Sequence, residues 1–162
     1  VAGFKYAVVG VLYAVLLAFV VIAVWEDYSD TEDSDRDEAK AAIDLYHVSL
    51  ALPDKGSKIQ DAIRKYTQSV YDNSWDSMAL GGRSEVVGRD LRALNAALLA
   101  LNPSSPKEQV LFQHAIELLT LITDSRNARL ESANGSVPGV LWFVLLVGGM
   151  VSLGYPAFFA FV

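Results

Sequence analysis

The sequence has no cysteine, which excludes disulfide frameworks, thiolate metal sites and cysteine nucleophiles. It also lacks any charge in two long stretches, residues 6–25 and 132–162. All 19 acidic residues and 12 of the 13 basic ones lie between Glu26 and Glu131. A soluble globular chain distributes its charges along its length, whereas a charge at the centre of a bilayer costs about 2.5 to 3.5 kcal/mol. This segregation predicts a membrane protein.

Both uncharged stretches are long enough to cross a bilayer as a helix. Residues 6–25 rise about 30 Å as a helix, which is the thickness of the hydrocarbon core. Trp25 and Trp142 stand where interfacial aromatic residues are typical. Because the chain ends in an apolar run, we expect further segments beyond the sequence shown. The expected division is a transmembrane helix at residues 1–25, a helical domain outside the bilayer at residues 26–136, and a transmembrane helix at residues 137–162.

Between the two stretches the pattern of breakers and apolar residues predicts four helical segments. Ser105 can cap the last of them, with Pro106 at its first position and Glu108 as its capping-box partner. No segment alternates as a strand would. The predicted fold class is all-α, with two transmembrane helices flanking an antiparallel four-helix bundle whose outer helices continue the spans. The expected segments are residues 26–52, 57–78, 85–101 and 106–131.

An acidic face follows the first apolar stretch. Glu26, Asp30, Asp33 and Asp37 step by four, three and four residues and therefore share one side of a helix. Like charges at that spacing cost about a few tenths of a kcal/mol per pair. A solvated helix face is the plain interpretation. The alternatives are a cation bound at this face and a pore that uses its field.

The two outer helices of the predicted bundle carry opposite charges at matching heights. Glu38 lies thirteen residues after Trp25, and Arg129 lies thirteen residues before Trp142. In unbroken helices both side chains would stand about 20 Å from the membrane surface. The arginine pair is therefore expected to meet the acidic helix at Glu38 or Glu32. The predicted ion-pair network consists of Glu32, Glu38, Arg126 and Arg129.

Small residues recur at helical spacing in both apolar stretches. Such faces let helix backbones approach closely and drive association in lipid. Ordinary membrane composition is the alternative, but the register favours a packing face and a homo-oligomer. The predicted face consists of Gly10, Ala14, Ala18, Gly148 and Ser152.

The charge balance bears on partners and orientation. The middle region has a net charge of −7, which disfavours nucleic acid and anionic lipid headgroups as partners. The expected partner is the lipid bilayer, through the two apolar stretches. Lys5 is the only base beside the far end of the first span. The expected location is the cell membrane, as a multi-pass protein with its bundle outside the cytoplasm.

The sequence offers no residues for enzymatic chemistry. It has no phosphate-binding glycine loop, no supported Ser/His/Asp arrangement and no zinc-binding helix motif. His47 and His114 are the only histidines, and two lone histidines in a bundle are more often surface or core residues than metal ligands. We therefore expect no catalytic residue, no metal and no cofactor.

Several short motifs spread over nearly the whole chain resemble one family. They are Val8-Val9-Gly10-Val11-Leu12-Tyr13, Trp25-x-x-Tyr28, Glu32, Glu38-Ala39, Leu45-Tyr46, Leu52-Pro53, Tyr66, Val70, Trp75, Met78, Leu101-Asn102-Pro103, Arg126-x-x-Arg129-Leu130 and Pro138-x-x-Leu141-Trp142. The sequence is thereby similar to the bestrophin-like domain family of integral membrane proteins. The resemblance implies a further span on each side and a link to bestrophin anion channels. Ser74 stands where the resemblance implies an acidic residue.

Two functions compete on these observations. The first is an oligomeric ion channel or pore component, although an acidic ring would favour cations. The second is a membrane-tethered helical bundle that acts as a sensor or as an assembly and interaction module. The oligomeric state distinguishes them best, because a ring of subunits around an axial path supports a pore.

Overall fold

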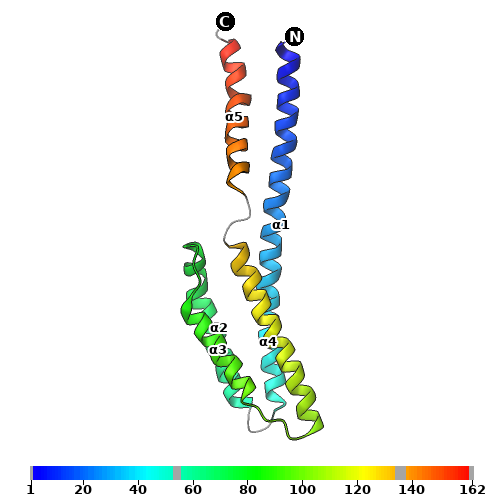
Figure 1. Ribbon diagram of the computed structural model, residues 1–162, viewed down its shortest axis with the longest axis vertical. Helices are drawn as coiled ribbons and strands as arrows, with labels where there is room; N and C mark the ends of the chain where they lie inside the picture. Colours follow the sequence, from blue (N-terminus) through cyan, green and yellow to red (C-terminus); the bar gives the residue numbers. More distant parts are fainter. Residues whose placement is uncertain (1, 53–55, 134–137, 161–162) are drawn as a thin grey trace. The chain divides into compact units, whose positions relative to one another are not determined.

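The computed structural model describes residues 2–52, 56–133 and 138–160, with side chains for 7–52, 56–133 and 138–154. Within these ranges all regular structure is helical and no strand occurs, which confirms the all-α prediction. The domain boundary expected at residues 136–137 and the side chain of Lys5 lie outside these ranges. The helices are α1 (Ala2–Leu50), α2 (Gly56–Ala79), α3 (Glu85–Leu99), α4 (Pro106–Ser132) and α5 (Gly139–Ala160) (Figure 1).

Turn and capping residues set the ends of the middle helices. Gly81, just after α2, has a φ of 69°, which a residue without a Cβ adopts at low cost. Ser84 caps α3 through its side chain. Ser105 Oγ accepts a hydrogen bond from the Glu108 backbone N at 3.2 Å, as the sequence predicts. The Glu108 carboxylate accepts from the Ser104 backbone N at 2.7 Å, one residue before the position that a capping box uses.

The chain divides into two compact units. Residues 30–134 form the first, which we call the core unit. Residues 1–29 and 135–162 form the second, which we call the apolar unit. The helix α1 is continuous in both, because no Gly or Pro interrupts the sequence between Gly10 and Pro53.

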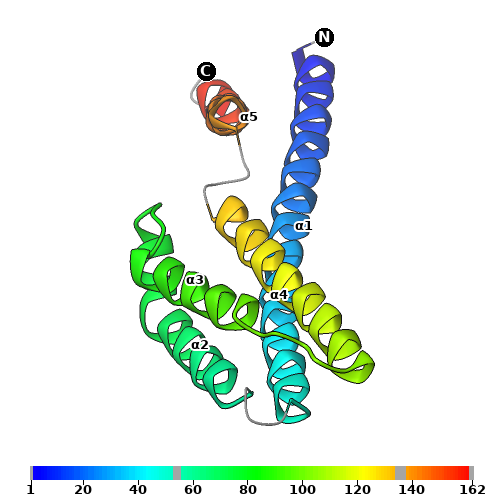
Figure 2. The same ribbon diagram turned by 60° about the horizontal axis from the view of Figure 1, so that its bottom comes forward.

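The core unit has one hydrophobic core, to which α2, α3, α4 and the end of α1 all contribute. Figures 1 and 2 both show α2 beside α3, and α4 against α1. One apolar side of α3 points inward, with Leu94 and Leu98 fully buried. The buried residues of this core are Ala41, Ala42, Leu45, Leu52, Ile59, Ile63, Tyr66, Val87, Leu94, Leu98, Ala115, Leu118, Leu119 and Ile122.

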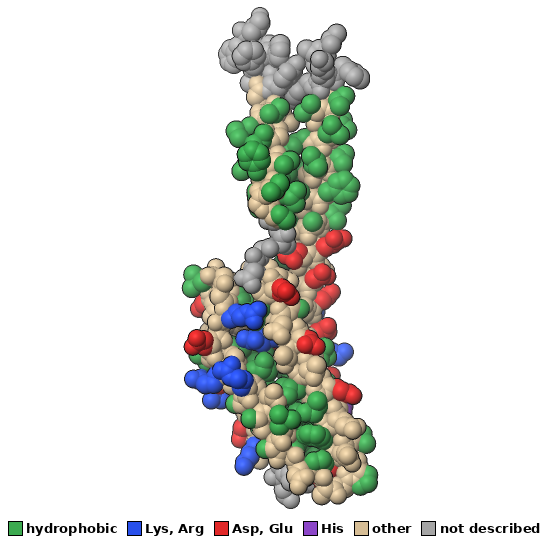
Figure 3. All heavy atoms as spheres, in the orientation of Figure 1, with side chains coloured by type: hydrophobic (Ala, Val, Ile, Leu, Met, Phe, Trp, Pro, Cys, Tyr) green, Lys and Arg blue, Asp and Glu red, His purple; other side chains and the backbone are tan. Residues whose placement is uncertain are grey.

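The apolar unit exposes its hydrophobic side chains instead of burying them. Between Val8 and Val24 most large apolar residues of α1 are exposed, and the same holds for α5 between Val140 and Leu153 (Figure 3). A surface this apolar marks contact with a membrane or another protein. Among the described residues, α1 alone is long and apolar enough to cross a bilayer, and the described apolar stretch of α5, Gly139–Gly154, is shorter. These features indicate association with a membrane.

Candidate functional site

A fully buried ion pair lies in the core unit between α1 and α4. Arg129 has 0% of its surface exposed and Glu38 has 4%. Arg129 Nη2 donates to Glu38 Oε2 at 2.7 Å, and Arg129 Nε donates to the same oxygen at 3.2 Å. Removing two charges from water costs several kcal/mol per ion, so the pair holds only because the attraction and further hydrogen bonds offset that cost.

Side chains of α2 complete the pair. Tyr66 OH donates to Glu38 Oε1 at 2.6 Å, and Arg129 Nη1 donates to Ser74 Oγ at 2.8 Å. The guanidinium carbon of Arg129 lies 5.6 Å from the centre of the Trp75 ring, within the range of a cation–π contact. Three helices thus meet at one guanidinium. We call Glu38, Tyr66, Ser74 and Arg129 the Arg129 network.

The pKa of Tyr66 is raised well above its usual value of about 10. Burial is the largest cause, and the charge of Glu38 and the hydrogen bond to it act in the same direction. Arg126 and Arg129 lower the pKa, but by less. Tyr66 therefore stays protonated and keeps donating to Glu38.

Of the two acids and two arginines in the predicted network, the structure brings one acid and one arginine together. Arg129 meets Glu38, whereas Glu32 accepts from Arg36 at 2.6 Å on the exposed side of α1. Arg126 lies beside Gly88 of α3, with Nη2 at 3.9 Å from the position that a Cβ on this glycine would take. Within the described residues, no ion pair joins Arg126 to an acid.

Sequence reasoning placed neither the residues of α2 nor Asp35 beside Arg129. Asp35 Oδ1 lies 3.7 Å from Arg129 Nε and is half-exposed. Ser74 supplies a hydroxyl to Arg129 at the position where the family resemblance implies an acidic residue. Tyr66 was noted only among the residues of the family resemblance, although a buried tyrosine hydroxyl normally requires a partner, and that requirement was the available signal.

The predicted acidic face lies on another side of α1 from the Arg129 network. Glu26, Asp30 and Asp37 are exposed, and Asp33 Oδ1 is 3.4 Å from Arg36. Glu26 belongs to the apolar unit and the other three acids to the core unit. Among the described residues no group of three His, Asp or Glu side chains is arranged to hold a metal ion.

Of the predicted packing face, Gly148 on α5 has a close neighbour within the apolar unit. The Tyr13 ring packs on Gly148, where an added Cβ would come within 2.6 Å of it, and Tyr13 OH donates to the Leu145 carbonyl at 3.1 Å. Gly10 has no such neighbour within 4 Å of its Cβ position. Ala14 and Ala18 are exposed, and Ser152 is half-buried.

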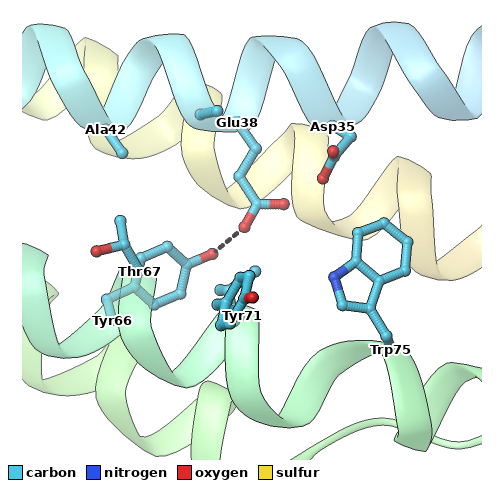
Figure 4. A pocket seen from close by; sticks show the side chains of 9 residues that line it. Asp35, Glu38, Ala42, Tyr66, Thr67, Tyr71 and Trp75 are labelled. Atoms are coloured by element: carbon cyan, nitrogen blue, oxygen red, sulfur yellow. Dashed lines mark hydrogen bonds between the residues drawn. The ribbon is translucent and has the colours of Figure 1, made fainter.

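A cavity of about 260 Å³ adjoins the Arg129 network in the groove between α1 and α2. Figure 4 shows Asp35 and Glu38 projecting from α1, and Tyr66 and Trp75 projecting from α2 toward them. The cavity joins two carboxylates with three aromatic rings, so it can hold a small molecule that carries positive charge. Its lining residues are Asp35, Glu38, Ala39, Ala42, Tyr66, Thr67, Val70, Tyr71 and Trp75.

The family model described as the bestrophin-like domain matches residues 1–161 of the chain. No curated protein and no solved structure matches the chain. The match covers the sequence on both sides of the core unit as well as the core unit itself.

Replacing Glu38 with glutamine should lower the free energy of unfolding by about 3 to 5 kcal/mol, because it leaves the buried Arg129 charge with only the half-exposed Asp35, 3.7 Å away, as a counter-charge. Denaturation of the full chain in detergent, followed by circular dichroism, measures the change. Glu32→Gln is the matched control. Its pair with Arg36 is exposed, with side-chain exposures of 47% and 67%, so about 0 to 1 kcal/mol is expected. Equal losses for the two variants would contradict the prediction.

Replacing Tyr66 with phenylalanine should cost about 1.5 to 3 kcal/mol at pH 7, because Glu38 loses a buried donor. In the unfolded chain the phenol ionises near pH 10. Its folded pKa is higher, so the stabilisation is complete below pH 10 and falls as the pH rises above it. The free energy of unfolding, measured from pH 8 to 11, should decline more steeply with pH in the native protein than in Tyr66→Phe. The exposed Tyr71→Phe is the control, and identical slopes for native protein and Tyr66→Phe would refute this account.

Proposed function

The chain belongs to the bestrophin-like domain family, and from this premise we propose that it is an integral membrane receptor with two spanning helices. In this proposal the apolar part of α1 and α5 cross the bilayer, and residues 30–134 form a four-helix bundle outside it. Binding of a small molecule to the bundle changes the arrangement of the two spanning helices. The proposed role is non-enzymatic, since the sequence presents no catalytic constellation.

The observation that carries the proposal is the Arg129 network beside the cavity. The network ties α1 to α4, and these two helices lead along the chain into the two apolar segments. Glu38 belongs to both the network and the cavity lining, so a bound molecule would change the partners of the ion pair. A ligand shifts a protein between two arrangements only as far as it binds them with different affinity, and contact with Glu38 supplies such a difference.

A second candidate function is an oligomeric ion channel or pore component. The family description favours it, and so does the exposure of Ala14 and Ala18, which leaves that face of α1 open to another subunit. In a symmetric assembly the acids of α1 would form rings, which favour cations over anions. Lys5, at the far end of the first span, favours a location of the bundle outside the cytoplasm.

The receptor proposal is tested by cross-linking the two apolar helices. The native chain has no cysteine, so Tyr13→Cys with Gly148→Cys introduces one defined pair. A Cβ at Gly148 would lie 3.7 Å from Tyr13 Cγ, so the two Cβ atoms stand within about 5 Å, near the separation that a disulfide spans. Adding Glu38→Gln, under conditions in which circular dichroism shows that the variant stays folded, should change the rate of cross-linking in membranes by about fivefold or more. Glu32→Gln should leave the rate unchanged, and an unchanged rate in Glu38→Gln would rule out the coupling.

The pore proposal is tested by the mass of the assembly in detergent. Gly10→Leu and Ala14→Leu should weaken homo-oligomers, because a larger side chain prevents close approach of the helix backbones. Ala23→Leu adds the same bulk at an exposed position on the opposite side of the helix and serves as the control. An oligomer of unchanged mass in both test variants counts against assembly through this face.

A further inference from the structure

We infer that the cavity between α1 and α2 binds a small organic cation, an amine or a quaternary ammonium compound. This inference names the ligand class of the proposed receptor and rests on that proposed function. It places the cation on the side of α1 that carries Asp35 and Glu38, and not on the exposed side of Asp30, Asp33 and Asp37.

The first argument is the charge of the lining. Both charged residues that line the cavity, Asp35 and Glu38, are acids. Among the described residues, the base within 4 Å of either is Arg129, which contacts Glu38 at 2.7 Å and Asp35 only at 3.7 Å. Arg129 is thus the one base in contact with the two acids, while Arg126 acts on the neighbouring Tyr66 from a longer distance, and Asp35 is half-exposed with acceptor capacity left over. A second cation is therefore electrostatically favoured there.

The second argument is the aromatic content of the lining. The rings of Tyr66, Tyr71 and Trp75 line one cavity, and aromatic faces attract cations within about 6 Å of their centres. Arg129 already shows this chemistry within the protein. Its guanidinium lies between a carboxylate and the Trp75 ring, 5.6 Å from the ring centre. A ligand cation in the cavity would have the same two kinds of neighbour.

The third argument is size and ligand count. A volume of about 260 Å³ suits a molecule of a few heavy atoms. Calcium takes about six to eight oxygen ligands, but the cavity presents two carboxylates, and both Glu38 oxygens already accept hydrogen bonds. Aromatic rings supply attraction to an ammonium group without providing oxygen ligands, so the lining fits an organic cation better than a hard metal ion.

The test uses the purified full chain in detergent and isothermal titration with choline chloride. The neutral molecule of the same shape, 3,3-dimethyl-1-butanol, is the control for size. Choline should bind at a single site, and the alcohol should bind about tenfold more weakly or not at all. Equal affinities, or no binding of choline, would overturn the inference. Tight binding of calcium chloride in competition with choline would overturn it as well.

Variants locate the site. Asp35→Asn and Tyr71→Leu should each weaken choline binding about three- to tenfold. Both positions are substantially exposed, so folding should be preserved. Asp37→Asn removes an exposed acid that does not line the cavity and should leave the affinity unchanged. Equal affinities in Asp35→Asn and Asp37→Asn would place the cation elsewhere and refute the inference.

The ligand class and the receptor role fail separately. If choline does not bind but Glu38→Gln still changes the cross-linking of positions 13 and 148, the ligand class is wrong and the receptor role stands. If choline binds at Asp35 but Glu38→Gln leaves cross-linking unchanged, the ligand class stands and the receptor role is wrong.

Discussion

The need to satisfy one buried guanidinium governs the arrangement of the core unit. Arg129 is fully buried, and such a charge is tolerated only with a counter-charge and with partners for its remaining donors. Glu38 must therefore face α4, which fixes the rotation of α1 about its own axis. The same rotation turns Ala41, Ala42 and Leu45 into the core and leaves Asp30 and Asp37 in solvent. The pairing of Glu38 and the burial of the apolar residues thus select the same side of α1 as core.

The sequence predicted that Arg126 and Arg129 would meet α1 at Glu38 or Glu32, because these residues lie on long helices and helical rise is constant. It did not distinguish Arg129 from Arg126, since residues three apart lie on nearly the same side of a helix. The packing of α3 and α4 makes that choice, and it places Arg126 beside Gly88. The positions of Ser74 and Trp75 depend on how α2 packs on both neighbours. No local pattern in the sequence records that packing.

In the apolar unit too, the sequence predicted the general character of the structure but not its individual contacts. Segregation of charge sufficed to predict a membrane-associated chain, because the penalty for a charge in the bilayer is large and independent of partners. Spacing also identified Gly148 as a packing position. It did not identify what packs there. The neighbour is the Tyr13 ring, which combines a close fit against glycine with a hydrogen bond to the Leu145 carbonyl. Shape complementarity of this kind requires knowledge of both helices.

A buried ion pair adds little to stability compared with apolar residues of the same volume, because desolvation cancels most of the attraction. That near-balance suits the proposed receptor. The pair holds α1 and α4 in one arrangement through an attraction that desolvation largely offsets, so a charged ligand that contacts the same acids acts directly on that arrangement. A cation near Asp35 would draw on the acids that Arg129 needs, and would weaken the attraction that Arg129 feels. The ligand cannot shift the equilibrium between two arrangements of the helices by more than the difference in its binding free energy for them. The two arrangements must therefore differ in free energy by only a few kcal/mol. An apolar contact at the same place would hold the helices as firmly, but it would give a charged ligand nothing to compete for.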